Sequence, residues 1–188
     1  MRDKTENRLL FIDTETGGVD PQKHSLLSIA LVVWDSSDGV IDSKEFFIKH
    51  NEYIITSEAK KINKFDIDKH ELVALDAKSV IGDIRVFCAK FFPDDNLIPL
   101  AGHNTQFDVS FLRVFLESQG RSFNQLFSHR ILDTYSIIMY LIYAEKIPPN
   151  VVSSAKVFQH FGIKVNGRHT ALGDALATVK LFERLLEL

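Results

Sequence analysis

The residues Leu9-Leu10-Phe11-Ile12-Asp13-Thr14-Glu15 join a short apolar run to two acids. The run is rich in branched side chains and predicts a buried β-strand over residues 9–13. Because strand side chains alternate between faces, Asp13 and Glu15 are expected to point the same way at the end of this strand. Two such carboxylates repel each other and resist burial, and a divalent cation such as Mg²⁺ relieves both costs. Two solvated turn acids also explain the pattern, and for so short a match that simpler interpretation is the more common one.

A second acidic position, Asp108, lies near the start of a predicted helix over residues 105–119. Thr105 is the expected N-cap and Gly120 the expected stop signal. An acid in the first turn meets the helix dipole favourably, which is a purely structural explanation. Against that explanation, Asp108 shares its helix face with apolar residues, and an acid there is unusual unless it is paired or binds a metal. These apolar residues are Phe111, Leu112 and Phe115.

A third acidic position, Asp174, repeats this anomaly in the last predicted helix, over residues 170–188. Its face carries Ala177, Thr178, Leu181 and Leu185. Thr170 is a good N-cap, so His169 is expected on the loop that enters the helix. A loop histidine can turn toward a site without distorting the helix, although a single histidine taken alone is more often a surface residue.

The remaining pattern predicts one α/β domain over residues 1–188. Strands come first and then alternate with helices, which indicates a mixed sheet flanked by helices. The further strands are expected at 26–34 and 40–48, as a hairpin, and at 97–101 and 128–132. The further helices are expected at 57–64, at 77–92, from the end of the strand at 128–132 to about residue 144, and at 151–161.

Composition narrows the class of protein. The chain is 45% hydrophobic and 25% charged, as ordinary globular proteins are. Its one cysteine, Cys88, excludes an intramolecular disulfide and a cysteine-based zinc cluster, and is expected to be an inert helix-core thiol. The net charge of −3 argues against a passive DNA-binding module but not against an enzyme whose acids are neutralised by cations. With no signal-peptide core or membrane span, a soluble cytoplasmic protein is expected.

The three acidic motifs together resemble one family. Asp-x-Glu after a first strand, His-Asn-x-x-Phe-Asp opening a middle helix and His-x-x-x-x-Asp opening the last helix are similar to the motifs of the DnaQ-like (DEDDh) 3′→5′ exonucleases. This family includes the proofreading subunit of bacterial replicative DNA polymerase, RNase T and oligoribonuclease. The resemblance runs from about Leu9 to Leu185. It implies a ribonuclease-H-like fold, with a mixed five-stranded sheet, its first three strands antiparallel, flanked by helices.

The resemblance also implies roles for five residues. It casts Asp13, Glu15, Asp108 and Asp174 as ligands of two divalent cations, Mg²⁺ or Mn²⁺, and His169 as general base. Two cations about 3.5–4 Å apart hold the attacking water and the leaving 3′ oxygen of a phosphodiester in line. An imidazole exchanges protons near neutral pH. The products would be nucleoside 5′-monophosphates.

The resemblance further suggests residues that contact the 3′-terminal nucleotide: Thr14, Thr16, Gly17, His103, Asn104, Phe107 and Arg168. The family usually has Thr where this chain has Gly17, which makes the loop more permissive and leaves that contact in doubt. A bond that holds the turn explains Asn104 equally well, packing beneath the helix is the favoured interpretation of Phe107, and a solvated side chain is the alternative for Arg168. Asp133 is expected to cap a helix.

Three hypotheses follow. The first is an active exonuclease that acts on the 3′ end of DNA, with single strands preferred. The second is an RNA-directed exoribonuclease, which shares all the chemistry and differs in contacts to the 2′-hydroxyl. The third is a non-catalytic nucleic-acid-binding subunit, which the intact motifs disfavour. A homodimer or a polymerase-associated subunit is compatible with each.

Overall fold

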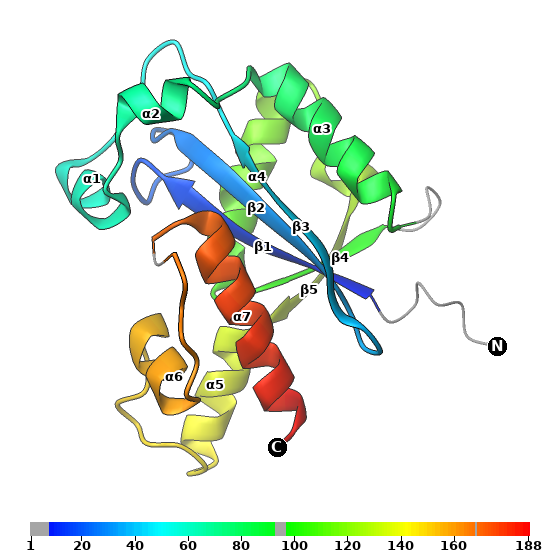
Figure 1. Cartoon of the computed structure of the whole chain (residues 1–188), viewed down its shortest axis with the longest axis vertical. Helices are drawn as coiled ribbons and strands as arrows, with labels where there is room; N and C mark the ends of the chain where they lie inside the picture. Colours follow the sequence, from blue (N-terminus) through cyan, green and yellow to red (C-terminus); the bar gives the residue numbers. More distant parts are fainter. Residues whose placement is uncertain (1–7, 93–96, 168) are drawn as a thin grey trace.

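The computed structural model describes residues 8–92, 97–167 and 169–188. Its centre is a five-stranded sheet with strand order β3-β2-β1-β4-β5 (Figure 1). The strands are β1 (Arg8–Thr16), β2 (Leu26–Asp35), β3 (Gly39–Phe47), β4 (Ile98–Gly102) and β5 (Phe127–Asp133). β1 to β3 pair antiparallel, and β4 and β5 join parallel to β1. The predicted mixed sheet, with its first three strands antiparallel, is therefore confirmed.

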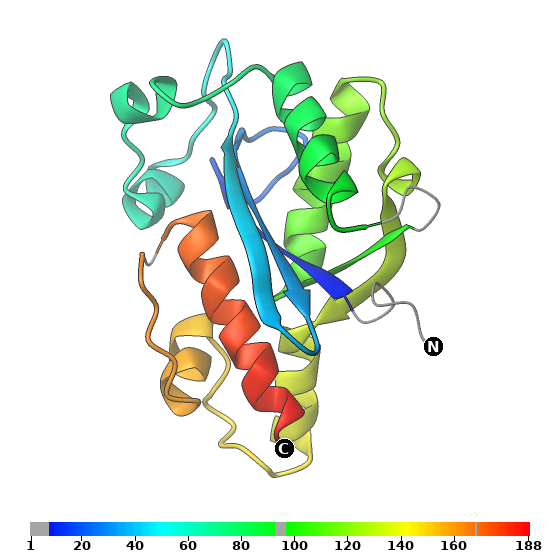
Figure 2. The ribbon, with the colours of Figure 1, turned by 45° about the vertical axis from the view of Figure 1, so that its right-hand side comes forward.

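Helices cover both faces of the sheet (Figure 2). One face packs against α3 (Ala77–Ala89) and α4 (Thr105–Ser118), with Leu10, Ile12 and Phe111 in the shared core. The other face packs against α7 (Ala171–Leu186). Beside α7 lie α5 (Thr134–Tyr143) and α6 (Ser154–His160), which form a third apolar cluster with it. This layering follows from the alternation in β1, where Leu10 and Ile12 face one way and Phe11 the other.

All the predicted helices are present, with local corrections to their ends. α3 ends at Ala89 rather than at residue 92, and the predicted breaker Pro93 lies outside the described residues. α6 begins after Ser153, three residues later than predicted, because the Ser153 hydroxyl caps it by accepting from the Lys156 N–H. α1 (Ser57–Asn63) matches its prediction.

Among the described residues, one α-helix was not predicted. α2 (Ile67–Glu71) is five residues long, too short for a helical period to show. The Asp66 side chain accepts from the Lys69 N–H and caps it, so Asp66 was the available signal. Cys88 is fully buried on α3, where burial raises the pKa of its thiol to about 12, as expected of an inert core residue.

β1 extends beyond the end of its parallel neighbour β4, and this leaves a gap in the sheet. Its register with β4 pairs Leu10 with Leu100 and Phe11 with Ala101, and β4 ends at Gly102. The last residues of β1, from Asp13 onward, therefore have β2 on one side and the start of α4 on the other. Crevices of this kind, beyond the carboxyl ends of parallel strands, are where α/β proteins place ligands.

No helix in the described part of the chain combines the length and the apolar character needed to cross a bilayer.

Candidate active site

Asp13 and Glu15 lie at the end of β1 on the face that α7 covers. They pair across the antiparallel ladder with Ala30 and Ser28 of β2. Both acids are half-buried, whereas Thr14 between them points to the opposite face and is buried. The period-two prediction for Asp13 and Glu15 is confirmed.

Asp108 reaches this end of β1 from the other face of the sheet. It lies in the first turn of α4 and is only 5% exposed. The Thr14 hydroxyl donates to its Oδ1 at 2.7 Å, so a β1 side chain fixes the orientation of the carboxyl group. An acid placed this deeply needs a partner, as expected for the apolar face of a helix.

The predicted N-cap of α4 was wrong by one residue. Asn104 is the cap, in the left-handed region with φ 61°, and Thr105 is the first helical residue and fully buried. The cause lies far along the chain: Asp133, at the end of β5, accepts from the Asn104 N–H at 2.8 Å and fixes the turn. Asp133 also accepts from the Tyr135 N–H and caps α5, which confirms its predicted capping role.

Asp174 and His169 come from the entrance to α7. The Thr170 hydroxyl accepts from the Gly173 N–H at 3.1 Å, which confirms the predicted N-cap. His169 is left-handed with φ 65°, and its backbone N–H donates to Asp174 Oδ2 at 3.3 Å. The preceding loop lies so close to the helix that a Cβ on Gly173 would be 2.2 Å from the Gly167 carbonyl oxygen. The His169 backbone and the Asp174 carboxylate are therefore held together.

The electrostatics join the four acids into one group. Burial raises the pKa of Asp13 well above its ordinary value, and the charges of Asp108, Glu15 and Asp174 raise it further, in that order. Burial also raises the pKa of Asp108 to about 7, although the hydrogen bond from Thr14 works in the opposite direction. Carboxyl groups from β1, α4 and α7 are thus close enough to Asp13 to disfavour its ionisation.

The donor set suits a hard divalent cation. Carboxylate oxygens are the ligands that Mg²⁺ and Mn²⁺ prefer, and a cation would reverse the repulsion around Asp13. Among the described residues, no three His, Cys, Asp or Glu side chains converge on a single point that would hold an ion as they stand. Asp108 is turned toward Thr14, and Asp174 accepts from the His169 N–H. The residues therefore fit divalent cations in the chemistry of their donor atoms.

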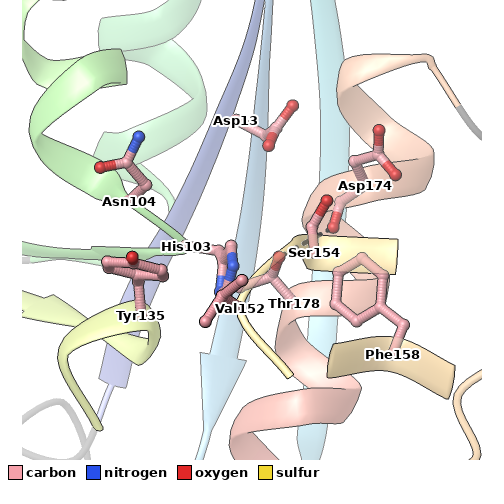
Figure 3. A pocket seen from close by; sticks show the side chains of 9 residues that line it. All are labelled: Asp13, His103, Asn104, Tyr135, Val152, Ser154, Phe158, Asp174 and Thr178. Atoms are coloured by element: carbon pink, nitrogen blue, oxygen red, sulfur yellow. Dashed lines mark hydrogen bonds between the residues drawn. The ribbon is translucent and has the colours of Figure 1, made fainter. Parts of the chain in front are cut away.

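A hollow of about 450 Å³ opens beside two of the acids (Figure 3). Asp13 and Asp174 lie at one end of it, and the aromatic residues Tyr135 and Phe158 line the rest with His103. The His103 Nδ1 lies 3.0 Å from the Thr134 hydroxyl, and its ring contacts those of Tyr135 and Phe158. Asn104, exposed, also lines this hollow. Tyr135, Ser154 and Phe158 were not predicted, because they lie outside the three motifs.

Two further hollows adjoin Glu15. One, of about 370 Å³, is lined by His169 together with Glu45 and Lys64, so His169 and Asp13 line different hollows. The other, of about 440 Å³, is more apolar and is lined by Thr14, Thr16, Val19, Ile62 and Phe107, among others.

The structure shows how Phe107 and Gly17, two of the predicted contact residues, are packed. Phe107 is half-buried: it packs against the core and its ring contacts Phe111, yet it also lines the apolar hollow. Gly17 does not serve as a flexible position. A Cβ there would lie 2.1 Å from the Ile54 carbonyl oxygen, and the Gly17 N–H donates to the Ser25 carbonyl at 2.7 Å. Gly17 allows two backbone segments to pack closely, which corrects the predicted permissive loop.

Of the other predicted contact residues, Thr16 is described by the structure and Arg168 is not. Thr16 is buried, and its hydroxyl donates to the Gly18 carbonyl at 2.7 Å. Arg168 lies outside the described residues.

Comparison with known proteins gives one consistent result. The RNase T exonuclease family matches residues 10–182. Ribonuclease T of Wigglesworthia glossinidia brevipalpis is 28% identical over 92% of this chain and 81% of its own length. The DNA polymerase III subunit epsilon of Aquifex aeolicus is 25% identical over 100% of this chain and 85% of its own length.

Among solved structures, Escherichia coli exonuclease I in complex with a dT13 oligonucleotide superposes with a TM-score of 0.79 at 18% identity. The match covers 96% of this chain and 41% of exonuclease I, so the chain corresponds to less than half of that protein. The chain belongs to the RNase T family of exonucleases, the DnaQ-like family that its three acidic motifs indicate.

Proposed function

We propose that this protein is a 3′→5′ exonuclease that uses two divalent cations, Mg²⁺ or Mn²⁺, and releases nucleoside 5′-monophosphates. The observation that carries the proposal is the electrostatic environment of Asp13: burial raises its pKa, and the charges of Asp108, Glu15 and Asp174 raise it further. Four carboxylates at the open end of a sheet are costly without bound cations. In a member of an exonuclease family, an anionic phosphodiester is the natural substrate for such a site.

Each acid would have a distinct role. Asp13, whose pKa all three other acids raise, would hold both cations. Glu15 and Asp174 would hold the cation that activates water, and Asp108 the cation that serves the leaving 3′ oxygen. Cations bound here supply neutralisation of the phosphodiester and activation of water. His169 Nε2 or Nδ1 would accept the proton of the attacking water, from a ring that lines the hollow next to Glu15.

The hollows give the substrate strand a plausible course. The apolar hollow with Phe107 and Val19 would take the terminal base. The hollow with His103, Tyr135 and Phe158 would take the next nucleotide, because aromatic rings stack on bases without regard to sequence. Such a course requires bases free of a partner strand, and the dT13 complex of exonuclease I is consistent with a single-stranded substrate. Residues 1–188 would act as one exonuclease domain.

RNA is the second candidate substrate. The observation that favours it is the relative named ribonuclease T, which is slightly more similar to this chain than the DNA polymerase III subunit is. The chemistry at the acids is the same for both substrates, and only contacts to the 2′-hydroxyl would separate them. DNA remains the first candidate.

The test uses matched 20-mer DNA and RNA oligonucleotides, single- and double-stranded, each labelled at either the 5′ or the 3′ end. With Mg²⁺, the 3′ label should leave at once as a mononucleotide, while 5′-labelled strands should shorten progressively. EDTA should stop the reaction, and added Mn²⁺ should restore it.

Two variants control for contamination. Asp174→Asn should lose activity by several orders of magnitude, because a predicted cation ligand is lost. Asp83→Asn on α3, which removes only an exposed ion pair with Lys44 of β3, should keep its activity. Release of the 5′ label first, internal cleavage, or equal activity in Asp174→Asn and wild type would contradict the proposal.

A further inference from the structure

The first turn of α7 carries or adjoins two predicted active-site residues, so its placement matters more than that of an ordinary helix start. The first N–H groups of a helix have no partner within the helix. Here the Thr170 N–H donates to the Gly167 carbonyl at 3.1 Å and the Gly173 N–H to the Thr170 hydroxyl at 3.1 Å. Between them, the backbones of Ala171 and Leu172 approach the Glu45 carboxylate closely enough to favour its charged form, and Glu45 lines one hollow together with His169 and Thr170.

Glu45 comes from β3, two strands away from Asp13, and the sheet register brings it there. Asp13 pairs with Ala30, and Ala30 pairs with Glu45, so the three share one row and one face. The buried Ser28, which pairs with Glu15, donates its hydroxyl to Glu45 Oε1 at 2.8 Å. Glu45 thus connects β2 and β3 to the start of α7.

Glu45 is a fifth carboxylate beside the four predicted ligands, and it is held differently from them. Its side chain is half-buried and lines the hollow that contains Glu15 and His169. Burial raises its pKa, whereas the three donors Ser28, Leu172 and Ala171 favour its charged form. Its charge also contributes to the raised pKa of Asp13. A negative charge at this point additionally complements the positive end of the helix dipole.

We propose that Glu45, oriented by Ser28, is a positioning residue that fixes the first turn of α7 so that Asp174 and His169 meet the cations and the substrate. The proposal rests on the proposed nuclease function. Groups that orient ligands without binding the metal typically contribute tenfold to a hundredfold to metal affinity or activity.

The opposite end of the same helix offers a matched control. Glu183 of α7 accepts from the Trp34 indole N–H at 3.0 Å and so also ties α7 to β2 through one carboxylate. Both glutamates are half-buried, but Glu183 lines none of the three hollows around the acids. Loss of either tether should loosen the packing of α7, and only loss of Glu45 should change the active site.

The experiment compares Glu45→Ala, Glu45→Gln and Glu183→Ala. Glu45→Ala should lower kcat about tenfold to a hundredfold with little change in KM, and should weaken Mn²⁺ binding, measured by calorimetry, about tenfold. Glu45→Gln keeps an acceptor oxygen and should recover most of both. In hydrogen exchange without metal, the amides of Ala171 and Leu172 should exchange faster in Glu45→Ala than in Glu183→Ala.

The outcomes separate the inference from the proposed function. If wild type fails to degrade any oligonucleotide with Mg²⁺ or Mn²⁺, the nuclease function itself is wrong. If wild type is active and Glu45→Ala matches Glu183→Ala in kcat, Mn²⁺ affinity and amide exchange, the positioning role is wrong. Equal losses in Glu45→Gln and Glu45→Ala, with both folded, would also overturn it, since hydrogen-bond acceptance would then not be what matters.

Discussion

Phe11 and Asp13 lie two residues apart on β1 and face the same side of the sheet, yet their surroundings are opposite. Phe11 is fully buried, and its ring lies 5.5 Å from that of Phe182, which in turn contacts Trp34 at 5.1 Å. Asp13 lies among carboxylates that raise its pKa. The same strand and the same helix α7 therefore build a stable apolar end and a destabilised acidic end. The difference indicates that the acidic end is kept for chemistry, at a cost in stability.

Asp13→Ala is expected to have the largest effect, and it tests whether the acidic end of β1 serves activity rather than stability. Loss of the central carboxylate should lower nuclease activity by several orders of magnitude, because Asp13 is the proposed ligand of both cations. The metal-free variant should unfold at the same temperature as wild type or higher, because the buried Asp13 carboxylate and its repulsion by the neighbouring acids are removed. Steady-state rates and thermal unfolding in EDTA check both statements. A marked fall in stability would mean that Asp13 holds the fold together.

Phe11→Ala should show the reverse. It removes a fully buried ring and should lower the free energy of unfolding by about 3–5 kcal/mol. Mn²⁺ affinity should stay close to that of wild type wherever the variant is folded. Urea unfolding measures the stability and calorimetry the Mn²⁺ affinity. A large change in metal affinity with unchanged stability would contradict the division of β1 into a stabilising apolar end and a metal-binding acidic end.

Asp108→Asn tests, through the pH dependence of stability, whether the buried acids destabilise the metal-free protein. The folded protein holds the Asp108 proton up to a pKa of about 7, whereas the unfolded chain releases it near the ordinary value of 3.8. As pH rises between these values the unfolded state binds fewer protons, so the metal-free protein loses stability. A tenfold change in proton affinity corresponds to about 1.4 kcal/mol, so the advantage of Asp108→Asn over wild type should grow by on the order of 2–3 kcal/mol between pH 5 and pH 8.

The measurement is urea unfolding in EDTA at pH 5 and pH 8. The stability of Asp108→Asn relative to wild type should be greater at pH 8 than at pH 5. Saturating Mg²⁺ should stabilise wild type more at pH 8 than at pH 5. A gain that is independent of pH would show that the charge of Asp108 is not its source.

The smallest expected effect is that of Gly17→Thr, which introduces the residue usual in the family. The new Cβ would lie 2.1 Å from the Ile54 carbonyl oxygen, so a backbone shift is required and should cost about 1–3 kcal/mol. Activity should fall only modestly in the folded variant. Thermal unfolding checks the cost, and unchanged stability would show that the loop moves freely.

The sequence was sufficient for features set by local periodicity. The alternation in β1 placed Asp13 and Glu15 on one face, and the apolar stripes of α4 and α7 made Asp108 and Asp174 anomalous. The N-cap at Thr170 was also correct, because its hydrogen bond to Gly173 is local.

Features set by contacts between distant segments could not be predicted. The start of α4 depends on Asp133, 29 residues further along the chain, which fixes the left-handed Asn104. Glu45 was missed because its row in the sheet depends on the register of the β2–β3 hairpin. The close approach of Ile54 to Gly17 is likewise invisible in a sequence.

The claim on which the account depends is that four acids from β1, α4 and α7 share two cations. Calorimetric titration of the metal-free protein with Mn²⁺ at pH 7.5 tests it most directly. Wild type should bind two ions per chain, and Asp13→Ala should lose this paired binding while Asp83→Asn retains it. Absence of Mn²⁺ binding by folded wild type, or an unchanged two-ion isotherm in Asp13→Ala, would contradict the account.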